Sequence, residues 1–552
     1  MLAVLFNKNK LGEDTPHAVL NWRLWYGVFV FGLMGAARGL DEGLIGTSAE
    51  QPSFQETFGL DDASGKSEAE KAALLGNITG MVQMGSILGA LIAFFLTDKI
   101  GRLWATRELC FLWVLGITIF LAAASNGSIG MVYAGRFIAG VGIGQTTVVA
   151  PTYLAETAPR TVRGFCVCMF SGAVYLGIML AYFGSYGSNL HISEKTQMQW
   201  VVPNLMHIYF AAIIFFASFL AIESPRWLIK VGKHEKAAAN LSKLRNLDVH
   251  HWYVQSEIID INDQLNRERE ATKGTTWFGP IRELLSDKGN LYRMQLSVMS
   301  QLLSQWSGAS SITIYAAKYF AMMGTSGEKE KLFATAIFGV VKFVSAMLCA
   351  FFLIDWLGRK RSLMIGITCQ LIAMLYMAIF LLLDTGVGDE GYTPTGAVKH
   401  AAMGAIVMIY ISGFGWALGW NSIQYLINSE IYPLRLRALG GSFAMTFHFA
   451  NQYGNSKAVP SMFISMTNGG TMAFFVGITA IGLVWVYFFL PELANKSLES
   501  IDAVFALPWY QIGRRGKELT QNVGGMAENY NSEKDKMDMV ENVAEVQPER
   551  RV

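Results

Sequence analysis

Charge and cysteine are both scarce in this 552-residue chain, and each shortage excludes a class of protein. Only 16% of the residues are charged, and the net charge of +2 indicates neither a nucleic-acid partner nor a generally acidic one. The cysteines lie in or beside apolar stretches and show no disulfide or metal-ligand spacing, so we expect small apolar residues. They are Cys110, Cys166, Cys168, Cys349 and Cys369.

Motifs of catalysis and nucleotide binding are also missing. The sequence has no P-loop ending in Lys-Ser or Lys-Thr, no nucleophile elbow and no cluster with metal-ligand spacing. The glycine-rich run at 140–144 lies inside an apolar stretch with no strand before it, so it is not a dinucleotide-binding loop. We therefore expect no enzyme, no ATP-driven pump, no cofactor and no metal site.

Apolar residues, in contrast, are abundant and come in blocks. They make up 52% of the chain, whose mean hydropathy is +0.33. Most blocks approach the ~20 residues that a membrane-spanning helix needs. The sequence predicts an all-α, polytopic membrane protein with twelve transmembrane helices. They lie roughly at 25–44, 75–96, 109–124, 131–154, 165–186, 200–222, 294–320, 332–354, 362–383, 402–426, 438–456 and 470–490.

The basic residues between these blocks indicate how the chain is oriented. An even number of helices places both termini on one side, and the loops after the even-numbered helices share that side. Those loops carry clusters of Lys and Arg, whereas the opposite loops carry scattered lysines, so the positive-inside rule places both termini in the cytosol. The clusters are Lys99, Arg102 and Arg107; Arg160 and Arg163; Arg359, Lys360 and Arg361; and Arg435 and Arg437.

The longest polar stretch divides the chain into two halves. Within it, Val254, Ile258, Ile261 and Leu265 recur at helical spacing, which predicts short amphipathic helices under the bundle. The end of the chain is polar and poor in aromatics, a composition typical of disorder. We expect a cytosolic tail at 1–24, a six-helix bundle at 25–222, a cytosolic linker at 223–293, a second six-helix bundle at 294–490 and a largely disordered cytosolic tail at 491–552.

Matching charged motifs follow corresponding helices in the two halves, which indicates a duplication with a site between the repeats. Acids and arginines at the cytosolic helix ends could form ion pairs when the inner side is closed and release them when it opens. Alternatively, the arginines only anchor helix ends at the membrane interface. The predicted cytosolic gate comprises Asp98, Arg102, Glu156, Arg163, Glu223, Arg226, Asp355, Arg359, Glu430 and Arg437.

Together these motifs resemble the sugar porter family of the major facilitator superfamily, over residues from about 22 to 505. The stretch from Trp420 to Glu430 is similar to fungal members, including quinate permeases. The resemblance implies the major facilitator fold, alternating access and a place in the plasma membrane. It rests on Asp98-Lys99-Ile100-Gly101-Arg102, Asp355 to Lys360, Glu156 to Gly164, Glu223 to Leu228, and Pro491-Glu492 with Lys496, Leu498 and Glu499.

Ionisable residues inside apolar helices are costly, so each is a functional candidate. Asp41 and Arg136 match the family positions that take up the proton and partner it, and the resemblance implies those roles here. Alternatively, the two form a permanent ion pair that only fixes helix packing. Arg38, three residues before Asp41, could pair with it directly, tune it, or face an anionic solute. The other such residues are Glu42, His207, Lys342 and His448.

Polar side chains at family positions outline a solute site. On the seventh helix Gln305, Gly308 and Tyr315 match the hexose-carrier pattern, while Ser304 and Ser310 depart from it. Amides and hydroxyls suit sugar hydroxyls, and aromatic rings suit the apolar face of a sugar ring. The histidine among these residues either binds solute or only packs. The predicted solute-binding set is Gln305, Ser304, Ser310, Tyr315, Ser171, Asn421, Tyr425, His448 and Arg38.

These features predict a proton-coupled symporter of a monosaccharide, either a hexose or a pentose. Its partners would be the sugar or a similar polyhydroxylated solute, the proton and the lipid bilayer. One alternative is a carrier of an acidic polyol or sugar acid such as quinate or galacturonate, favoured by Arg38, His448 and the altered seventh helix. Another is a sensor that signals without moving solute, which the short tail and the presence of Asp41 and Arg136 disfavour.

Overall fold

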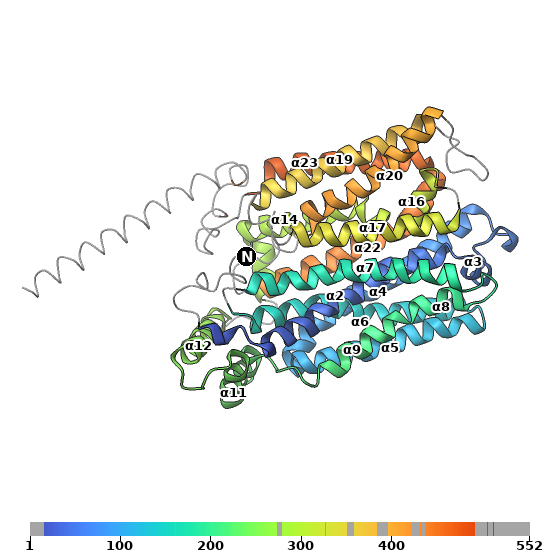
Figure 1. Cartoon of the computed structure of the whole chain (residues 1–552). Coiled ribbons are helices and arrows are strands. Elements are labelled where there is room, and N and C mark those ends of the chain that lie inside the picture. The colour runs from blue at the N-terminus through green and yellow to red at the C-terminus, as the bar shows by residue number, and fades with distance from the viewer. Residues whose placement is uncertain are drawn as a thin grey trace, which may run out of the picture.

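The protein is described here by a computed structural model that covers residues 16–159, 162–272, 279–325, 327–349, 358–383, 396–421, 431–432, 436–491, 505 and 512. Within these residues every regular element is a helix, and the long helices run side by side in one bundle (Figure 1). The predicted all-α fold is confirmed. The expected tails lie largely outside the described residues, at 1–15 and after 491 except for Phe505 and Ile512.

Six long segments form the first half. Helix α2 begins after Asn21, whose side chain accepts hydrogen bonds from the backbone N–H groups of Arg23 and Leu24. The sixth segment, expected as one helix, is interrupted at Leu205 close to Pro203, which has no backbone N–H. The elements are η2 (His17–Val19), α2 (Trp22–Ala49), α3 (Pro52–Phe58), η3 (Asp62–Ser64), α4 (Glu68–Ile100), α5 (Arg102–Ala122), η4 (Ala123–Ser125), α6 (Ile129–Thr157), α7 (Arg163–His191), α8 (Met198–Asn204) and α9 (Met206–Ala217).

Six further segments form the second half, and the first of them is broken twice. Gly308 adopts a left-handed φ of 86°, which interrupts the helix after Gln305, and a second break falls at Tyr315. The sequence predicted one continuous helix here. The elements are α14 (Lys288–Gln305), α15 (Ala309–Ile314), α16 (Ala316–Met322), α17 (Glu328–Leu348), α19 (Arg359–Leu383), α20 (Gly396–Trp416), η6 (Ala417–Asn421), α22 (Arg437–Ser465) and α23 (Thr467–Phe489).

The two halves meet through equivalent helices. Helix α4 packs against α22, and α7 packs against α17. Since α4 and α17 are each the second spanning segment of their half, and α7 and α22 each the fifth, one contact repeats the other with the halves exchanged. The predicted arrangement of two six-helix repeats is confirmed.

Nine of the described helical segments are long and apolar enough to cross a membrane. The segments α2, α14–α16 and α22 complete the predicted 12. Each falls outside this set for a local reason: α2 carries Arg38, Asp41 and Glu42, the α14–α16 segment is divided into shorter helices, and α22 carries polar residues such as His448 and Gln452. The spanning helices that are hardest to recognise are therefore the ones that bring polar groups inside.

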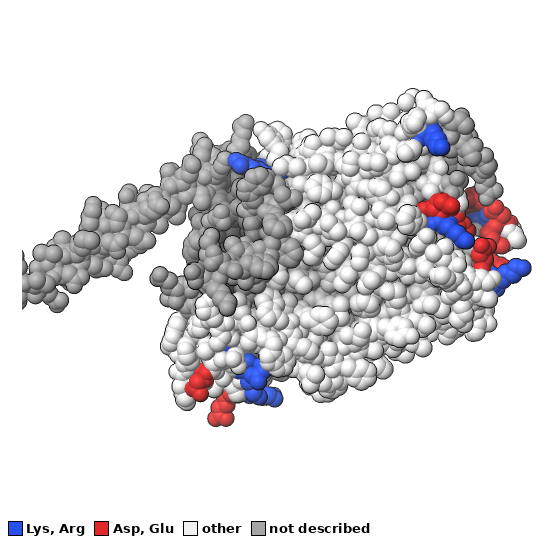
Figure 2. Space-filling view, in the orientation of Figure 1, with Lys and Arg blue, Asp and Glu red and all other residues white. Residues whose placement is uncertain are grey.

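The outer wall of the bundle is apolar. On the face that Figure 2 shows, Lys, Arg, Asp and Glu gather at the two ends, and the side between them lacks charge. Large apolar side chains are exposed on the spanning helices, among them Phe29, Phe95, Phe111 and Tyr209. A belt of this kind suits a bilayer, because hydrocarbon cannot solvate charge. The chain is a multi-pass membrane protein.

The predicted linker helices lie together at one end of the bundle, called here the linker end; α3 and α16 lie at the opposite, far end (Figure 1). Val254 and Leu265 of the predicted apolar stripe are buried. Arg245 bonds both oxygens of Glu257 at 2.6 and 2.8 Å and the carbonyl of Thr157 at 2.8 Å, which attaches the linker to the end of α6. The linker helices are α10 (Pro225–Lys230), α11 (His234–Arg245), α12 (Trp252–Thr272) and α13 (Gly279–Ser286).

Glycines bring α4 and α6 into close contact. A Cβ atom at Gly85 or Gly89 would collide with the backbone of α6, and one at Gly140 or Gly144 would collide with the backbone of α4. Small residues four positions apart let two helices approach closely. The contact holds α6 against α4 and so positions Arg136, which lies one turn before Gly140 on α6.

Candidate functional site

A polar pocket lies at the centre of the bundle, where α2, α7, α15, α17, α20 and η6 face one another. Its empty volume is about 470 Å³, part of which opens to the outside. Three charged residues line it: Arg38, Glu42 and Lys342. The remaining lining residues are Phe170, Ser171, Val174, Tyr175, Ser310, Thr313, Trp416 and Asn421.

The charged residues of the pocket form two linked groups. Arg38 Nε lies 2.7 Å from Glu42 Oε1, one helical turn further along α2, and Gln452 Nε2 of α22 donates to the same oxygen at 2.8 Å. Lys342 Nζ of α17 donates to Thr313 Oγ1 at 2.5 Å and lies 5.3 Å from the ring centre of Tyr175. All three charged groups are buried, so each relies on these contacts in place of water.

The ion pair of Arg38 differs from the direct Asp41 pair that its sequence position suggested. Glu42 is four residues after Arg38 and lies on the same side of α2, whereas Asp41 faces α6 and pairs with Arg136. Successive helical residues project about 100° apart, so the two neighbouring carboxylates serve different partners. Arg38 thus faces the pocket, and the alternative that it meets an anionic solute stays a prediction.

Hydroxyl, amide and aromatic groups supply the uncharged part of the pocket. Ser171, Ser310 and Asn421 of the predicted solute-binding set line it. Trp416 Nε1 donates to Tyr175 Oη at 2.8 Å, which orients both rings at the pocket wall. These groups can donate to and accept from solute hydroxyls and offer an apolar ring face.

Four other predicted solute-binding residues do not line the pocket. Gln305 accepts from Ser310 Oγ at 2.8 Å and lies 3.3 Å from His448 Nδ1, which also lies 2.7 Å from Gln301 Oε1. Gln305 and His448 therefore support the wall behind Ser310. The Ser304 hydroxyl donates to the carbonyl of Gln301 at 2.9 Å.

Tyr315, the fourth, lies in a seal between the halves at the far end. Its hydroxyl is 2.8 Å from Thr79 Oγ1 of α4 and donates to the carbonyl of Ser456 of α22 at 2.7 Å. Tyr425, also predicted, lies outside the described residues. The break at Gly308 redirects the segment that follows it, and neither Gln305 nor Tyr315 lines the pocket in this conformation; their role in solute binding stays a prediction.

Asp41 and Arg136 form a buried ion pair between α2 and α6. Arg136 Nη2 lies 3.2 Å from Asp41 Oδ1, and Arg136 Nε donates to the carbonyl of Ile78 at 2.8 Å. The exposed fractions of the two side chains are 1% and 2%, so neither meets bulk water in this conformation. Their closeness fits both a proton site and a packing contact, so the coupling role stays a prediction.

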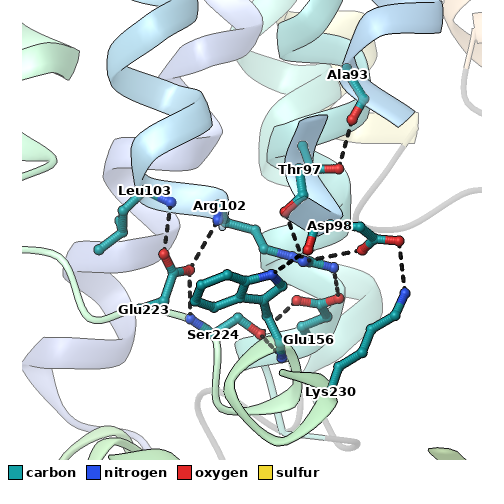
Figure 3. Close-up of polar contacts among 10 residues, drawn as sticks. Ala93, Thr97, Asp98, Arg102, Leu103, Glu156, Glu223, Ser224 and Lys230 are labelled. Atoms are coloured by element: carbon teal, nitrogen blue, oxygen red, sulfur yellow. Dashed lines mark hydrogen bonds and ion pairs between the residues drawn. The ribbon is translucent and has the colours of Figure 1, made fainter. Parts of the chain in front are cut away.

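A cluster of charges closes the linker end of the first half (Figure 3). Arg102 at the start of α5 lies 2.6 Å from Glu156 at the end of α6 and 3.3 Å from Asp98 at the end of α4. Glu223 accepts from the backbone N–H groups of Arg102 and Leu103 at 3.2 and 3.1 Å. These contacts join α4, α5, α6 and the segment before α10 into one unit.

Burial raises the pKa of Glu223 above its ordinary value, and the backbone N–H groups of Ser224, Leu103 and Arg102 act in the opposite direction. Its carboxylate lies at the N-terminus of α5, where a helix favours negative charge. Asp98 also accepts from Lys230 at 2.7 Å and Glu156 from the Ser224 hydroxyl at 2.5 Å, so α10 is tied to the same cluster.

Six predicted gate residues remain, and the structure describes the side chains of two of them. Arg163 is exposed at the start of α7, and Arg226 is partly buried in α10. Asp355 and Glu430 lie outside the described residues, as do the side chains of Arg359 and Arg437 at the starts of α19 and α22. The gating role of the whole set stays a prediction.

Two pocket residues, Glu42 and Lys342, were recognised in the sequence as membrane charges but not assigned to the solute site. Their cost inside an apolar helix was the available signal. His207, a third such residue, accepts from Trp113 Nε1 at 3.2 Å and packs within the first half. Among the residues that the structure describes, no three His, Cys, Asp or Glu side chains gather where a metal ion could bind.

Comparison with known proteins identifies the family. The model of the family described as "Sugar (and other) transporter" matches residues 27–505. The chain is 31% identical over 503 residues to the quinate permease of Neurospora terricola, an alignment that covers 90% of this chain and 92% of that one. It is 28% identical over 517 residues to the quinate permease of Emericella nidulans, covering 93% and 95%.

Solved structures show the same fold. The partially occluded, inward-open conformation of the E. coli xylose transporter XylE superposes with a TM-score of 0.71 at 19% identity, covering 86% of this chain and 100% of that one. The proton:xylose symporter XylE bound to 6-bromo-6-deoxy-D-glucose gives 0.71 at 20% identity, covering 88% and 99%. With its two six-helix repeats and its match to the family model, the chain belongs to the sugar porter family of the major facilitator superfamily.

Proposed function

We propose that this transporter is a proton-coupled carrier of a carboxylated polyhydroxylated solute, such as quinate or a uronic acid. The observation that carries the proposal is the charge of the central pocket. Arg38 and Lys342 both line it, and Glu42 is the only carboxylate among its described lining residues. One carboxylate cannot neutralise two cations, and buried charges are costly unless paired. A solute carboxylate supplies the missing negative charge.

The positions of the cations also suit such a solute. Lys342 is held by Thr313 on the far-end side of the pocket, and Arg38 is held by Glu42 on α2. The hydroxyl and amide groups of Ser171, Ser310 and Asn421 lie along the same pocket. A ligand with one carboxylate and several hydroxyls therefore satisfies both kinds of group. The similarity to relatives named quinate permease points the same way.

A neutral monosaccharide is the second candidate. The paired rings of Tyr175 and Trp416 beside serine hydroxyls suit a pyranose. The structural neighbour described as a proton:xylose symporter supports this reading. A neutral sugar does not balance the excess positive charge of the pocket, so we rank it second.

We assign proton binding to Asp41 and the partner role to Arg136. Burial in an apolar bundle favours a protonated carboxyl, and a nearby guanidinium favours the carboxylate, so their separation during alternating access would load or release a proton. Arg38, Arg136 and Lys342 face the two carboxylates Asp41 and Glu42, which leaves one excess positive charge. Adding a solute anion and a proton together leaves that net charge unchanged.

The contacts between and within the halves support alternating access. The halves touch at the far end through Tyr315, Thr79 and Ser456, whereas the contacts of the linker-end cluster stay within the first half and the linker. We propose that the far end faces outward across the plasma membrane and that both termini are cytosolic, as the basic loops favour.

The test is uptake of labelled quinate, galacturonate, glucose and xylose in cells that lack their own carriers, with and without a protonophore. We expect quinate or galacturonate to accumulate, the protonophore to abolish accumulation, and Asp41→Asn to do the same. Uptake of glucose or xylose alone would select the second candidate. Normal accumulation by the Asp41→Asn variant would show that the Asp41–Arg136 pair only fixes packing.

A further inference from the structure

A second, smaller cavity lies beside the central pocket and shares two residues with it. It is lined by Asp41, Val82, Gln83, Ser86, Ile143, Phe449 and Gln452, together with Arg38 and Glu42. Arg38 and Glu42 thus line both cavities, and Asp41 lines only the smaller one. The Arg38–Glu42 ion pair is the wall between the pocket that we assign to the solute and the cavity that contains the assigned proton site.

We infer that the Arg38–Glu42 pair couples solute binding to proton binding, an inference that rests on the proposed function. A solute carboxylate that approaches Arg38 competes with Glu42 for the guanidinium. The negative charge of Glu42 is then less fully neutralised by Arg38, and Glu42 remains adjacent to Asp41 in the chain. The uncompensated negative charge favours a proton on the Asp41 carboxyl, since charges interact strongly in an interior of low dielectric.

The contacts around Glu42 allow its charge to act on Asp41 while the backbone stays in place. Gln452 Nε2 holds the same Glu42 oxygen as Arg38 does, at 2.8 Å, so this carboxylate stays in place when the guanidinium shifts. Arg38 also lies 5.7 Å from the ring centre of Phe449, a residue of the smaller cavity, which gives the cation a second contact. The pair can therefore loosen while both side chains remain supported.

Other titratable groups face this pair from neighbouring helices. Tyr182 of α7 and Lys342 of α17 face Glu42, and His448 of α22 faces Arg38, whereas Arg136 of α6 faces Asp41. Lys342 is the second cation available to the solute, so an anion that it holds lies within reach of the Arg38–Glu42 pair in the same pocket. Binding free energies are reciprocal: a proton on Asp41 must then increase affinity for the anion by the factor that the anion increases affinity for the proton.

The inference is tested with Glu42→Gln in proteoliposomes loaded with a pH-sensitive dye. Exchange of labelled for unlabelled quinate measures solute binding and movement, and solute-induced proton uptake measures coupling. We expect Glu42→Gln to lower the number of protons taken up per quinate molecule transported at least about tenfold, beyond any loss of exchange that follows from its place in the pocket. Glu42→Asp, which restores a carboxylate next to Asp41, is expected to recover most of the proton uptake.

Glu108→Gln is the matched control, because Glu108 is a half-buried carboxylate of α5 that lines neither cavity; both activities should stay at the wild-type level. Proton uptake by Glu42→Gln at the wild-type ratio would overturn the inference, and so would a parallel loss of exchange and proton uptake that Glu42→Asp does not restore. If the wild type exchanges no carboxylated solute, the proposed function itself fails and the inference falls with it.

Discussion

The hydroxyl of Tyr182 in α7 donates a hydrogen bond to the backbone carbonyl of Thr313 in α15, at 2.6 Å, and so joins the two halves on the far-end side of the pocket. Thr313 also accepts from Lys342 through its side chain. One residue therefore connects a contact between the halves to a pocket cation.

The first prediction concerns the hydrogen bond between Tyr182 and Thr313. Tyr182→Phe removes one hydrogen bond between the halves, worth about 1 kcal/mol, and should shift the population toward the far-open state by up to about tenfold. Spin labels at Glu56 and Lys329, which are exposed at the far end on opposite halves, should report a larger fraction of long distances. Tyr209→Phe on the outer wall is the control. An unchanged distance distribution in Tyr182→Phe would mean that the Tyr182–Thr313 bond does not help to hold the far end closed.

The second prediction concerns Lys342. Lys342→Gln removes a pocket cation, so KM for galacturonate should rise about tenfold or more, while KM for galactose should change by less than about threefold. Initial uptake rates over a range of solute concentrations provide both values. The control is Lys318→Gln, since Lys318 lies over the ring of Phe463 and does not line the pocket. Equal increases for both solutes would mean that Lys342 supports the fold rather than recognising charge.

The third prediction concerns the linker-end cluster. Arg102→Gln leaves the nearly buried Glu156 carboxylate without its closest cation, a loss of about 3 kcal/mol or more in comparable pairs. The melting temperature in detergent should fall clearly. Lys230→Gln is the matched control, because both side chains of the Lys230–Asp98 pair are more than two-fifths exposed and such pairs contribute about 0–1 kcal/mol. A similar fall in melting temperature for the two variants would mean that burial does not strengthen the Arg102–Glu156 pair.

The fourth prediction concerns pH. The pKa of Glu223 is raised in the folded state, so the folded protein holds this proton more tightly than the unfolded chain does. The stability from this group is therefore present below its ordinary pKa of 4.5 and is lost as pH rises through the higher folded value. The melting-temperature difference between wild type and Glu223→Gln should shift against the wild type as pH rises from that value toward neutral. A shift in the opposite direction would mean that the backbone N–H groups outweigh burial.

Local signals predicted much of the architecture. Apolar block length indicated the spanning helices, charged motifs at helix ends indicated the repeat, and the cluster of Asp98, Arg102, Glu156 and Glu223 lies where those motifs meet. Such features depend on neighbours in sequence or on the end of a helix, so a pattern is sufficient to predict them.

The solute site depends on contacts across the bundle and was only partly predictable. Gln305 and Tyr315 were predicted from the family pattern, which does not show what each side chain contacts: Gln305 bonds Ser310, and Tyr315 bonds Thr79. Arg38 and Glu42 form their pair within one helix turn, yet only the packing of α17 shows that Lys342 faces the same space. A glycine such as Gly308 can indicate a helix break but not the direction of the chain after it, and a partner on a distant helix leaves no local sequence signal.

If the pocket selects a carboxylate, its affinity must depend on the charge of the solute. Galacturonate and galactose differ only in the carboxylate of the sugar acid, so their affinities for the purified wild-type protein isolate the contribution of charge. We predict that galacturonate binds at least about tenfold more tightly and that Lys342→Gln removes most of this preference. Equal affinities, or tighter binding of galactose, would contradict the account and favour a neutral sugar as the solute.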